Sequence, residues 1–371
     1  MPKTNSLKTS AAPRIAIIGT SPGSMLRALL LAKKYPAATI TLIDSNKQTG
    51  GAWYSEKSPA GYEIESGCHI WSYVPKVYEF IEREMGVKLY PVKPPPLFVG
   101  ARIKIPYSVK TTITSYKLFF RFLFTFRWRQ LQNLQRDPYI HFRIFGRRNR
   151  YPKSGSPELI HALENKIKLQ PTISIQLNTS VQAYHITDSV ATIQTEKGMQ
   201  EFDQLYLTYV SQIDHLTING LRVDVNVLEV NYVHLLIRTD KPLLKKMTYW
   251  RLINDPVIHR ITDISSQTNF EENLMLVGVK DNAYRPSGED ALMDHCHTLF
   301  KKYGLIDDTF RFEKIKTHIF PTHYLGEETM KELKKHKPVV SLMRTTDLMH
   351  GIYFLLKDEE SDSSELTDWT V

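Results

Sequence analysis

The stretch Ile15-Ala16-Ile17-Ile18-Gly19-Thr20-Ser21-Pro22-Gly23-Ser24, near the amino terminus, decides the fold. Its apolar start predicts a buried parallel strand, and the Leu-rich pattern that follows predicts a helix. A strand that turns sharply into a helix begins a dinucleotide-binding βαβ unit, whose turn brings bare backbone amides close to a diphosphate. Gly19 can make this turn, but Ser21 and Ser24 replace the usual second and third glycines, and Gly23 is offset by one position. We take Gly19, Ser21, Pro22, Gly23 and Ser24 as the candidate phosphate-contacting residues.

The context of this turn strengthens the interpretation. A second predicted strand, residues 38–43, ends at Asp44, which lies 25 residues after Gly19. An acidic residue at that place can accept hydrogen bonds from the ribose hydroxyls of a bound nucleotide. Residues 14–90 therefore predict a nucleotide-binding unit.

Two other interpretations of the turn stay open. The first is a purely structural strand–turn–helix that holds no ligand. The second arises because residues 19–23 also match the G-x-S-x-G nucleophile elbow of serine hydrolases. That fold places several strands before its elbow, whereas only eighteen residues precede Gly19.

The bulk composition is that of a globular protein. The 371 residues are enough for two or three domains, with 42% apolar and 23% charged residues. Two cysteines, Cys68 and Cys296, are too few for a disulfide framework and favour a reducing compartment. No apolar run reaches membrane-spanning length, and Pro22 and Gly23 interrupt the one stretch that resembles a signal peptide. We expect a cytoplasmic protein, with a peripheral place at a membrane left open.

The net charge of +9 is unevenly distributed. Residues 101–153 hold thirteen Lys or Arg and one acid, whereas the last fourteen residues hold six acids and no Lys or Arg. Within the basic block, residues 116–129 (YKLFFRFLFTFRWR) predict an amphipathic basic helix. Three roles stay open for this helix: a core element with a solvated stripe, a contact with the membrane surface, or a wall of a site for an anionic substrate.

Two other kinds of partner lack support in the sequence. No recognition motif accompanies the basic charge, so nucleic acid is not an expected partner. His295-Cys296-His297 resembles a metal-binding run, but neighbouring side chains on a helix point about 100° apart and cannot converge on one ion. We assign no metal ligands and expect Cys296 to lie in the core.

Several segments resemble the superfamily of amine oxidases, protoporphyrinogen oxidases and UDP-galactopyranose mutases. Gly50-Gly51-Ala52-Trp53 resembles its diglycine motif, and residues 62–70 (YEIESGCHI) resemble the acid, Gly and His that follow it. Residues 151–156 (YPKSGS) resemble its "YPxGG" segment before a helix, and residues 249–262 resemble part of a substrate domain. Residues 351–358 stand where the superfamily has its closing strand and Gly-Asp.

This resemblance implies FAD as the cofactor. Gly50, Gly51, Ala52 and Trp53 would then lie against the flavin diphosphate. Glu65, Gly67 and His69 would lie near the isoalloxazine, and Asp358 would be the closing acid. His69 would be the one candidate catalytic residue; the alternative is a helix-capping or core histidine.

The resemblance also implies an α/β fold class: a Rossmann-type FAD-binding domain, a second mixed α+β substrate domain and a basic helical insertion. We expect residues 1–13 to be disordered. Residues 14–100, 151–227 and 335–371 would form the discontinuous FAD-binding domain, with residues 101–150 as the insertion and residues 228–334 as the substrate domain.

The departures from the superfamily pattern bear on function. Two glycines of the first turn are missing, no Arg precedes the diglycine, and Lys357 replaces the closing Gly. The leading hypothesis is an FAD-dependent oxidoreductase acting on an anionic or amphipathic small molecule. One alternative is a redox-inactive relative that binds a nucleotide or a partner, and the other is a flavin-dependent sugar mutase-like enzyme. The substrate, the electron acceptor and the oligomeric state are not encoded in any motif.

Overall fold

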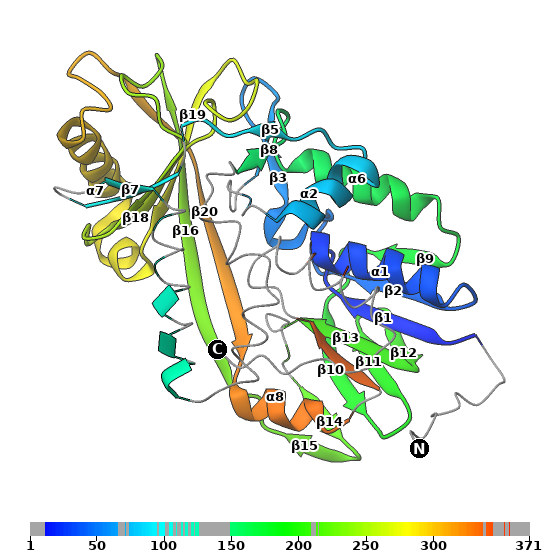
Figure 1. The fold of residues 1–371 in the computed structure, drawn as a ribbon. Helices are drawn as coiled ribbons and strands as arrows, with labels where there is room; N and C mark the ends of the chain where they lie inside the picture. The colour runs from blue at the N-terminus through cyan, green and yellow to red at the C-terminus, as the bar shows by residue number, and fades with distance from the viewer. Residues whose placement is uncertain are drawn as a thin grey trace. The chain divides into compact units, whose positions relative to one another are not determined.

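The computed structural model divides the chain into two compact units (Figure 1). Unit 1 comprises Met1–Gly51, Leu163–Glu229 and His323–Val371, and unit 2 comprises Ala52–Ala162 and Val230–Thr322. The structure describes residues 12–65, 71, 74–94, 96–100, 104–106, 149–208, 213, 215–336 and 339–343, with isolated positions between 109 and 125 and positions 352 and 356.

A five-stranded parallel sheet forms the centre of unit 1. Its strand order is β21-β13-β1-β2-β9, and every neighbouring pair is parallel. The strands are β1 (Arg14–Ile18), β2 (Thr39–Ile43), β9 (Ile173–Gln176), β13 (Gln204–Thr208) and β21 (Val340–Met343). Helix α1 (Pro22–Lys34) joins β1 to β2, as the opening stretch predicts. The predicted α/β class with a Rossmann-type parallel sheet is confirmed.

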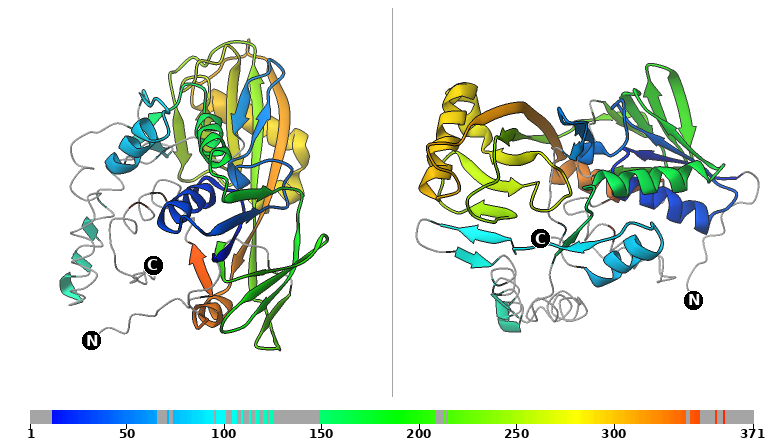
Figure 2. Two further views of the ribbon diagram at one scale, coloured as in Figure 1. Left: turned by 90° about the vertical axis from the view of Figure 1, so that its right-hand side faces the viewer. Right: turned by 90° about the horizontal axis from the view of Figure 1, so that it is seen from above.

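A second sheet covers the face of the parallel sheet opposite α1 (Figure 2). Its order is β12-β11-β10-β14-β15, and only the β10–β14 pair is parallel. Ala16 and Ile43 of the parallel sheet pack here against Tyr184, Ile193 and other apolar residues. The strands are β10 (Val181–Ile186), β11 (Ala191–Thr195), β12 (Gly198–Phe202), β14 (Leu216–Ile218) and β15 (Leu221–Val223).

Unit 2 is built on a seven-stranded mixed sheet of order β20-β16-β19-β18-β17-β6-β7. Helix α7 (Asp281–Lys302), which is interrupted at Gly288, packs on one face through Leu292, Cys296, Leu299 and Phe300 (Figure 1). The strands are β6 (Leu97–Val99), β7 (Lys104–Pro106), β16 (Val227–Thr239), β17 (Tyr249–Leu252), β18 (Ile258–Asp263), β19 (Asn273–Val279) and β20 (Phe312–Leu325).

Shorter elements complete the two units. They are η1 (Gly51–Trp53), β3 (Ser55–Lys57), β4 (Glu63–Glu65), α2 (Pro75–Arg83), β5 (Tyr90–Pro91), β8 (Arg150–Tyr151), α6 (Pro157–Lys168) and α8 (Glu327–Lys334). Helix α6 begins directly after Ser156, where the Ser-Pro start signal predicts it. No helix in the described part of the chain is long and apolar enough to cross a membrane.

The boundaries of the units differ from the expected ones. Residues 52–100 lie with unit 2, because Leu97 of β6 pairs with Trp250 of β17 and the Thr248 hydroxyl donates to the Pro94 carbonyl at 2.7 Å. The parallel sheet ends with β21, and of the segment 351–358, expected as a closing strand, the structure describes only Ile352 and Leu356, which are helical. Most of the basic insertion, 101–150, lies outside the described residues.

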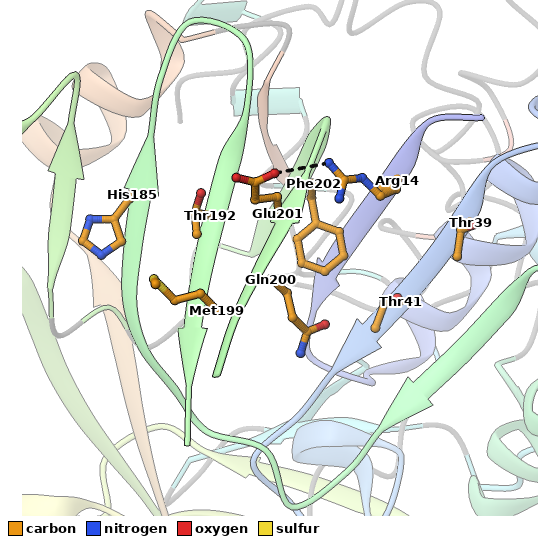
Figure 3. Close-up of a pocket in the computed structure, with 9 residues that line it drawn as sticks. All are labelled: Arg14, Thr39, Thr41, His185, Thr192, Met199, Gln200, Glu201 and Phe202. Carbon is orange, nitrogen blue, oxygen red and sulfur yellow. Dashed lines mark ion pairs between the residues drawn. The ribbon is translucent and has the colours of Figure 1, made fainter. Parts of the chain in front are cut away.

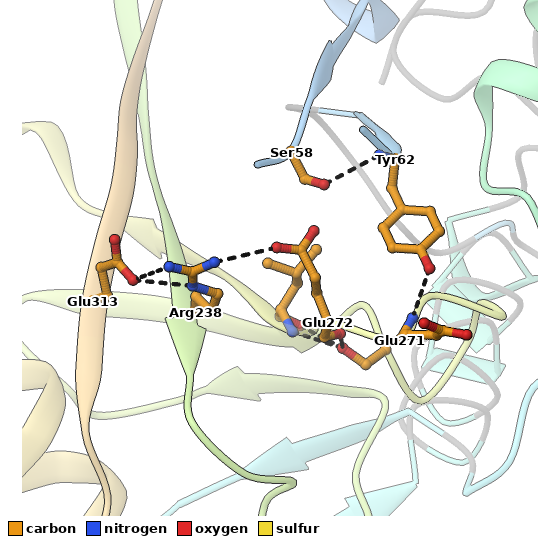
Figure 4. A network of polar contacts seen from close by, with 8 residues as sticks. Ser58, Tyr62, Arg238, Glu271, Glu272 and Glu313 are labelled. Carbon is orange, nitrogen blue, oxygen red and sulfur yellow. Dashed lines mark hydrogen bonds and ion pairs between the residues drawn. The ribbon is translucent and has the colours of Figure 1, made fainter. Parts of the chain in front are cut away.

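A polar network holds one end of the unit 2 sheet (Figure 4). Arg238 of β16 donates from Nε to Glu313 of β20 at 3.0 Å, and its Nη1 lies 3.5 Å from the carboxylate of Glu272. Nearby, the Glu271 amide donates to the Tyr62 hydroxyl at 3.3 Å, and Tyr62 stacks on Phe270. The charge of this arginine is therefore matched by carboxylates on two sides.

Gly278 of β19 lies where two basic side chains cross the strand. A Cβ atom at this position would stand 2.6 Å from His259 Nε2 and 2.7 Å from Arg260 Cγ. We therefore expect Gly278→Ala to lower the free energy of unfolding by about 1–3 kcal/mol, as overpacking does. Chemical denaturation measures the loss. Part of it should disappear in a His259→Ala background, and an equal loss in both backgrounds would contradict the steric cause.

Cys296 lies on the core-facing side of α7 and is fully buried. Burial, and then the charge of Asp255, raises the pKa of its thiol to about 12. Because the thiolate is the reactive form, we expect Cys296 to resist alkylation by iodoacetamide at pH 8 in the folded protein. Mass spectrometry of a Cys68→Ser variant tests this. Rapid labelling without denaturant would show that the site opens.

Candidate functional site

The turn after β1 has the backbone shape that the sequence predicts. Gly19 adopts φ +94°, a conformation that favours glycine, and its amide donates to the Ile43 carbonyl at 2.7 Å. The diglycine lies against the same turn: the Gly50 amide donates to the Thr20 carbonyl at 3.0 Å. A Cβ atom on Gly51 would stand 3.4 Å from the backbone of Ser21. The structure thus brings the two predicted phosphate-binding segments together.

Two of the amides at the start of α1, those of Ser24 and Met25, are already bonded to Ser21. Ser21 is the N-cap of α1: its Oγ accepts from the Ser24 amide at 3.2 Å and lies 3.0 Å from the Ser24 hydroxyl. The Met25 amide donates to the Ser21 carbonyl at 2.9 Å. Pro22, the first helical residue, has no amide hydrogen to offer. Of the first four helical residues, only Gly23 has an amide without a partner among the described residues.

Asp44 is engaged by its own neighbours. One carboxylate oxygen accepts from the Thr20 amide at 2.8 Å and the Thr20 hydroxyl at 2.6 Å. The other accepts from the backbone amide and the side-chain amide of Asn46, both at 2.9 Å. A carboxylate has about four acceptor positions, so this set fills them. Asp44 is also only 7% exposed. A ribose would have to displace at least one of these donors.

Glu65 lies in a separate buried cluster of unit 2. Burial, and then the charge of Glu65, raises the pKa of Tyr151 well above its ordinary value. The Tyr151 hydroxyl accepts from the Ser156 amide at 3.1 Å, and Trp71 Nε1 donates to the Ser156 hydroxyl at 3.2 Å. All four residues are buried. Glu65 of the segment 62–70 therefore lies close to Tyr151 of the segment 151–156.

The remaining predicted residues are less informative. Ala52 and Trp53 belong to η1, and the Trp53 side chain is half-buried. Gly67, His69 and Asp358 lie outside the described residues, as does half of the segment 116–129. Its described positions are helical or in a turn, and Phe120 and Phe124 among them are exposed.

A cavity of about 890 Å³ opens elsewhere in unit 1 (Figure 3). Arg14 and Thr39, the first residues of β1 and β2, line one side, and Gln200 and Glu201 of β12 line the other. Arg14 pairs with Glu201 at 3.6 Å. Doubly wound sheets bind nucleotides at the carboxyl ends of their strands, so this cavity lies at the opposite edge from the Gly19 turn.

Sequence reasoning missed Thr20 and Asn46, which close the corner. Two local signals point to the closure. Ser21-Pro22 is the same Ser-Pro helix start that predicts α6, and it indicates that Ser21 caps the helix. Asp44-Ser45-Asn46 is a turn in which an aspartate bonds to the backbone two residues on.

Comparisons with known proteins agree with this fold. The model of the NAD(P)-binding Rossmann-like domain matches residues 17–83. No curated protein shows significant sequence similarity to the chain.

Solved structures are similar over nearly the whole length. A putative protoporphyrinogen oxidase from Exiguobacterium sp. 255-15 has 13% identity, with 94% of this chain and 99% of that chain covered and a TM-score of 0.62. A fatty acid isomerase from P. acnes has 11% identity, 95% and 98% coverage and a TM-score of 0.62. Putrescine oxidase bound to putrescine has 10% identity, 94% and 98% coverage and a TM-score of 0.61.

The chain has the same α/β fold as these solved structures, with a Rossmann-like parallel sheet and a separate mixed sheet. It contains a dinucleotide-binding type of domain. The residues of the corner, however, do not fit a dinucleotide in the conformation observed. Ser21 caps the amide of Ser24, and Asp44 has its acceptor positions filled by Thr20 and Asn46.

Proposed function

We propose that this protein is a redox-inactive relative of the amine oxidase-like flavoenzymes, which uses the inherited fold to bind a ligand or a partner. The observation that carries the proposal is the set of four hydrogen bonds on the Asp44 carboxylate. In a nucleotide site this acid would accept from ribose hydroxyls. Here Thr20 and Asn46 supply those donors, so the chain replaces the nucleotide with its own groups.

The helix N-terminus supports the same proposal. A diphosphate binds such an end through free amides and the positive end of the helix dipole. Ser21 satisfies the Ser24 amide with its hydroxyl, and Pro22 supplies no amide hydrogen. A rotation of Ser21 would free one amide, but that hydrogen bond and the bond between the two serine hydroxyls would be lost.

A second candidate function is an FAD-dependent oxidoreductase. The positive φ angles of Gly19, Gly50 and Gly51 favour it, because these positions keep the glycine backbone of a diphosphate cradle. In such an enzyme the flavin would supply hydride transfer, while Gly19, Gly50 and Gly51 would hold the diphosphate. A sugar mutase-like activity would need the same flavin and depends on the same test. The substrates named for the similar structures range from a polyamine to a fatty acid, so the fold does not select a substrate.

The visible spectrum of the purified protein separates these candidates. We expect a colourless protein, with no flavin fluorescence in the supernatant after denaturation and no gain of absorbance after incubation with FAD. A matched variant, Thr20→Ala/Ser21→Gly/Ser24→Gly, removes the three hydroxyl groups of the corner, frees the Ser24 amide and one acceptor position of Asp44, and should take up FAD more readily than the wild type. A yellow wild-type protein with stoichiometric FAD would overturn the proposal in favour of the oxidoreductase.

A further inference from the structure

Basic side chains from three of four neighbouring strands line up on the face of the unit 2 sheet away from α7. The strand pairing places His234 of β16 and Arg260 of β18 on either side of Gly278 of β19, and it places Arg251 of β17 next to Arg260. Side chains of directly paired residues point to the same face of a sheet. Val233 and Leu235, which flank His234, pack with the α7 residues, so this row faces the other way.

A bulge adds a further basic group to the row. The β18–β19 register shifts between Ile258 and Arg260, which leaves His259 as the extra residue. Such a bulge re-aims side chains, and both His259 and Arg260 approach Gly278 within 2.8 Å of where its Cβ would be. Lys280, two residues after Gly278, contributes a positive charge at His259. We call Arg251, His259, Arg260 and Lys280 the basic cluster.

Arg251 and His259 lack the carboxylate contacts that Arg238 has among the described residues. Arg260 Nη2 lies 2.6 Å from His234 Nε2, and an imidazole ring adds no negative charge. Among the described residues, Arg251 and His259 have no acidic side chain bonded to them. Arg238, which lies further along β16 than His234, forms ion pairs with the carboxylates of Glu272 and Glu313 (Figure 4).

The positive charges of the cluster affect the pKa of His259. Burial, and then the charges of Arg260, Arg251 and Lys280, lower the pKa of this imidazole to about 4. Like charges placed side by side on neighbouring strands also destabilise a sheet. A negatively charged group among them would relieve this repulsion.

The cluster is accessible from one side. Arg260 is buried, His259 and Lys280 are half-buried, and Arg251 is exposed. An anion could therefore reach it from the Arg251 side and meet less water toward Arg260, where charge-assisted hydrogen bonds are stronger.

We propose that the basic cluster binds the phosphate or carboxylate group of a small molecule, with Arg251 at the entrance, Arg260 behind it and His259 and Lys280 beside it. A planar guanidinium donates two parallel hydrogen bonds to either oxyanion. This inference deepens the proposed binding function and rests on it for its biological use, but the site itself does not depend on whether FAD binds.

Isothermal titration with inorganic phosphate, and in a second arm with benzoate, tests the proposal. Ionic strength is held constant with sodium chloride, so that general screening is the same in every titration. The full-length wild type should bind at least one of the two anions saturably, and the arm that binds identifies the oxyanion. Arg251→Gln should lose at least tenfold in affinity for that anion. Arg251 is exposed and bonded to no described acid, so this variant should fold.

Arg311→Gln is the matched control, because it removes an exposed arginine of the same unit outside the cluster. It should bind as the wild type does. The absence of saturable binding in both arms, or equal affinity in Arg251→Gln and Arg311→Gln, would overturn the proposal. These titrations leave the Gly19 corner unchanged, so their failure is distinguishable from the appearance of FAD in the purified protein.

Discussion

Replacing Asp44 by alanine is expected to lower the free energy of unfolding by about 3–5 kcal/mol. The change removes four hydrogen bonds to a carboxylate and leaves the amide and hydroxyl of Thr20 in a fully buried place without their acceptor. Hydrogen bonds to charged groups contribute more than neutral ones, and a buried donor left without a partner adds its desolvation cost. Chemical denaturation of the ligand-free protein gives the value.

Asp224→Ala is the matched control for this prediction. Asp224 is an exposed aspartate of the same unit, and its loss should change the stability by no more than about 0.5 kcal/mol. If Asp44 instead served mainly to bind a ribose, Asp44→Ala would leave the ligand-free protein about as stable as the control. That outcome would contradict the closed corner.

His259 and Asp263 of unit 2 are expected to change the free energy of unfolding in opposite directions as the pH falls. Burial, and then nearby cations, lower the pKa of His259 to about 4, and burial raises the pKa of Asp263 to about 6. Between pH 6.5 and 4 the unfolded state takes up the His259 proton first, so this histidine destabilises the fold as the pH falls. Between pH 3.8 and 6 the folded state keeps the Asp263 proton, so this aspartate destabilises the fold as the pH rises. Each of the two pKa shifts changes the free energy of unfolding by at most about 3 kcal/mol.

Single variants should separate the two contributions. Asp263→Asn should become less stable from pH 6.5 to pH 4 relative to the wild type, and His259→Ala should become more stable over the same interval. Denaturation midpoints at half-unit steps of pH measure both slopes, with the double variant as the reference that lacks both groups. Parallel slopes in the two single variants would show that these side chains do not titrate as described.

The opening of the fold could be predicted from the sequence because its signals are local. A run of apolar residues, a glycine and an amphipathic stretch specify β1, the turn and α1 without information from distant residues. Asp44 could be placed at the end of β2 for the same reason. Its bonding to Thr20 could not, because Thr20 lies 24 residues away and competes for the acceptor positions that a ribose would use.

The division into units depends on pairings between distant segments. The three-residue strands β6 and β7 carry no strong pattern of their own, and only their pairing with β17 places residues 52–100 in unit 2. Residues 173–176 likewise extend the parallel sheet only through their pairing with β2. The apolar pattern of a short strand indicates that it is buried but not which strand lies next to it.

The basic cluster could not be predicted from the sequence, because its residues come together only through a bulge and strand pairing. His259 and Arg260 are adjacent, and regular alternation would send them to opposite faces of the sheet. The bulge at His259 and the missing side chain of Gly278 bring them to one face, and neither feature is marked by a turn motif in the sequence.

The corner formed by Gly19, Ser21 and Asp44 is closed to a nucleotide by its own hydrogen bonds. The ADP half of FAD is the part that such a corner would hold, so calorimetric titration of the wild-type protein with ADP, and then with FAD, tests it directly. We predict no saturable heat up to millimolar ligand. Saturable binding of either ligand in the micromolar range that is lost in Asp44→Ala would contradict the account.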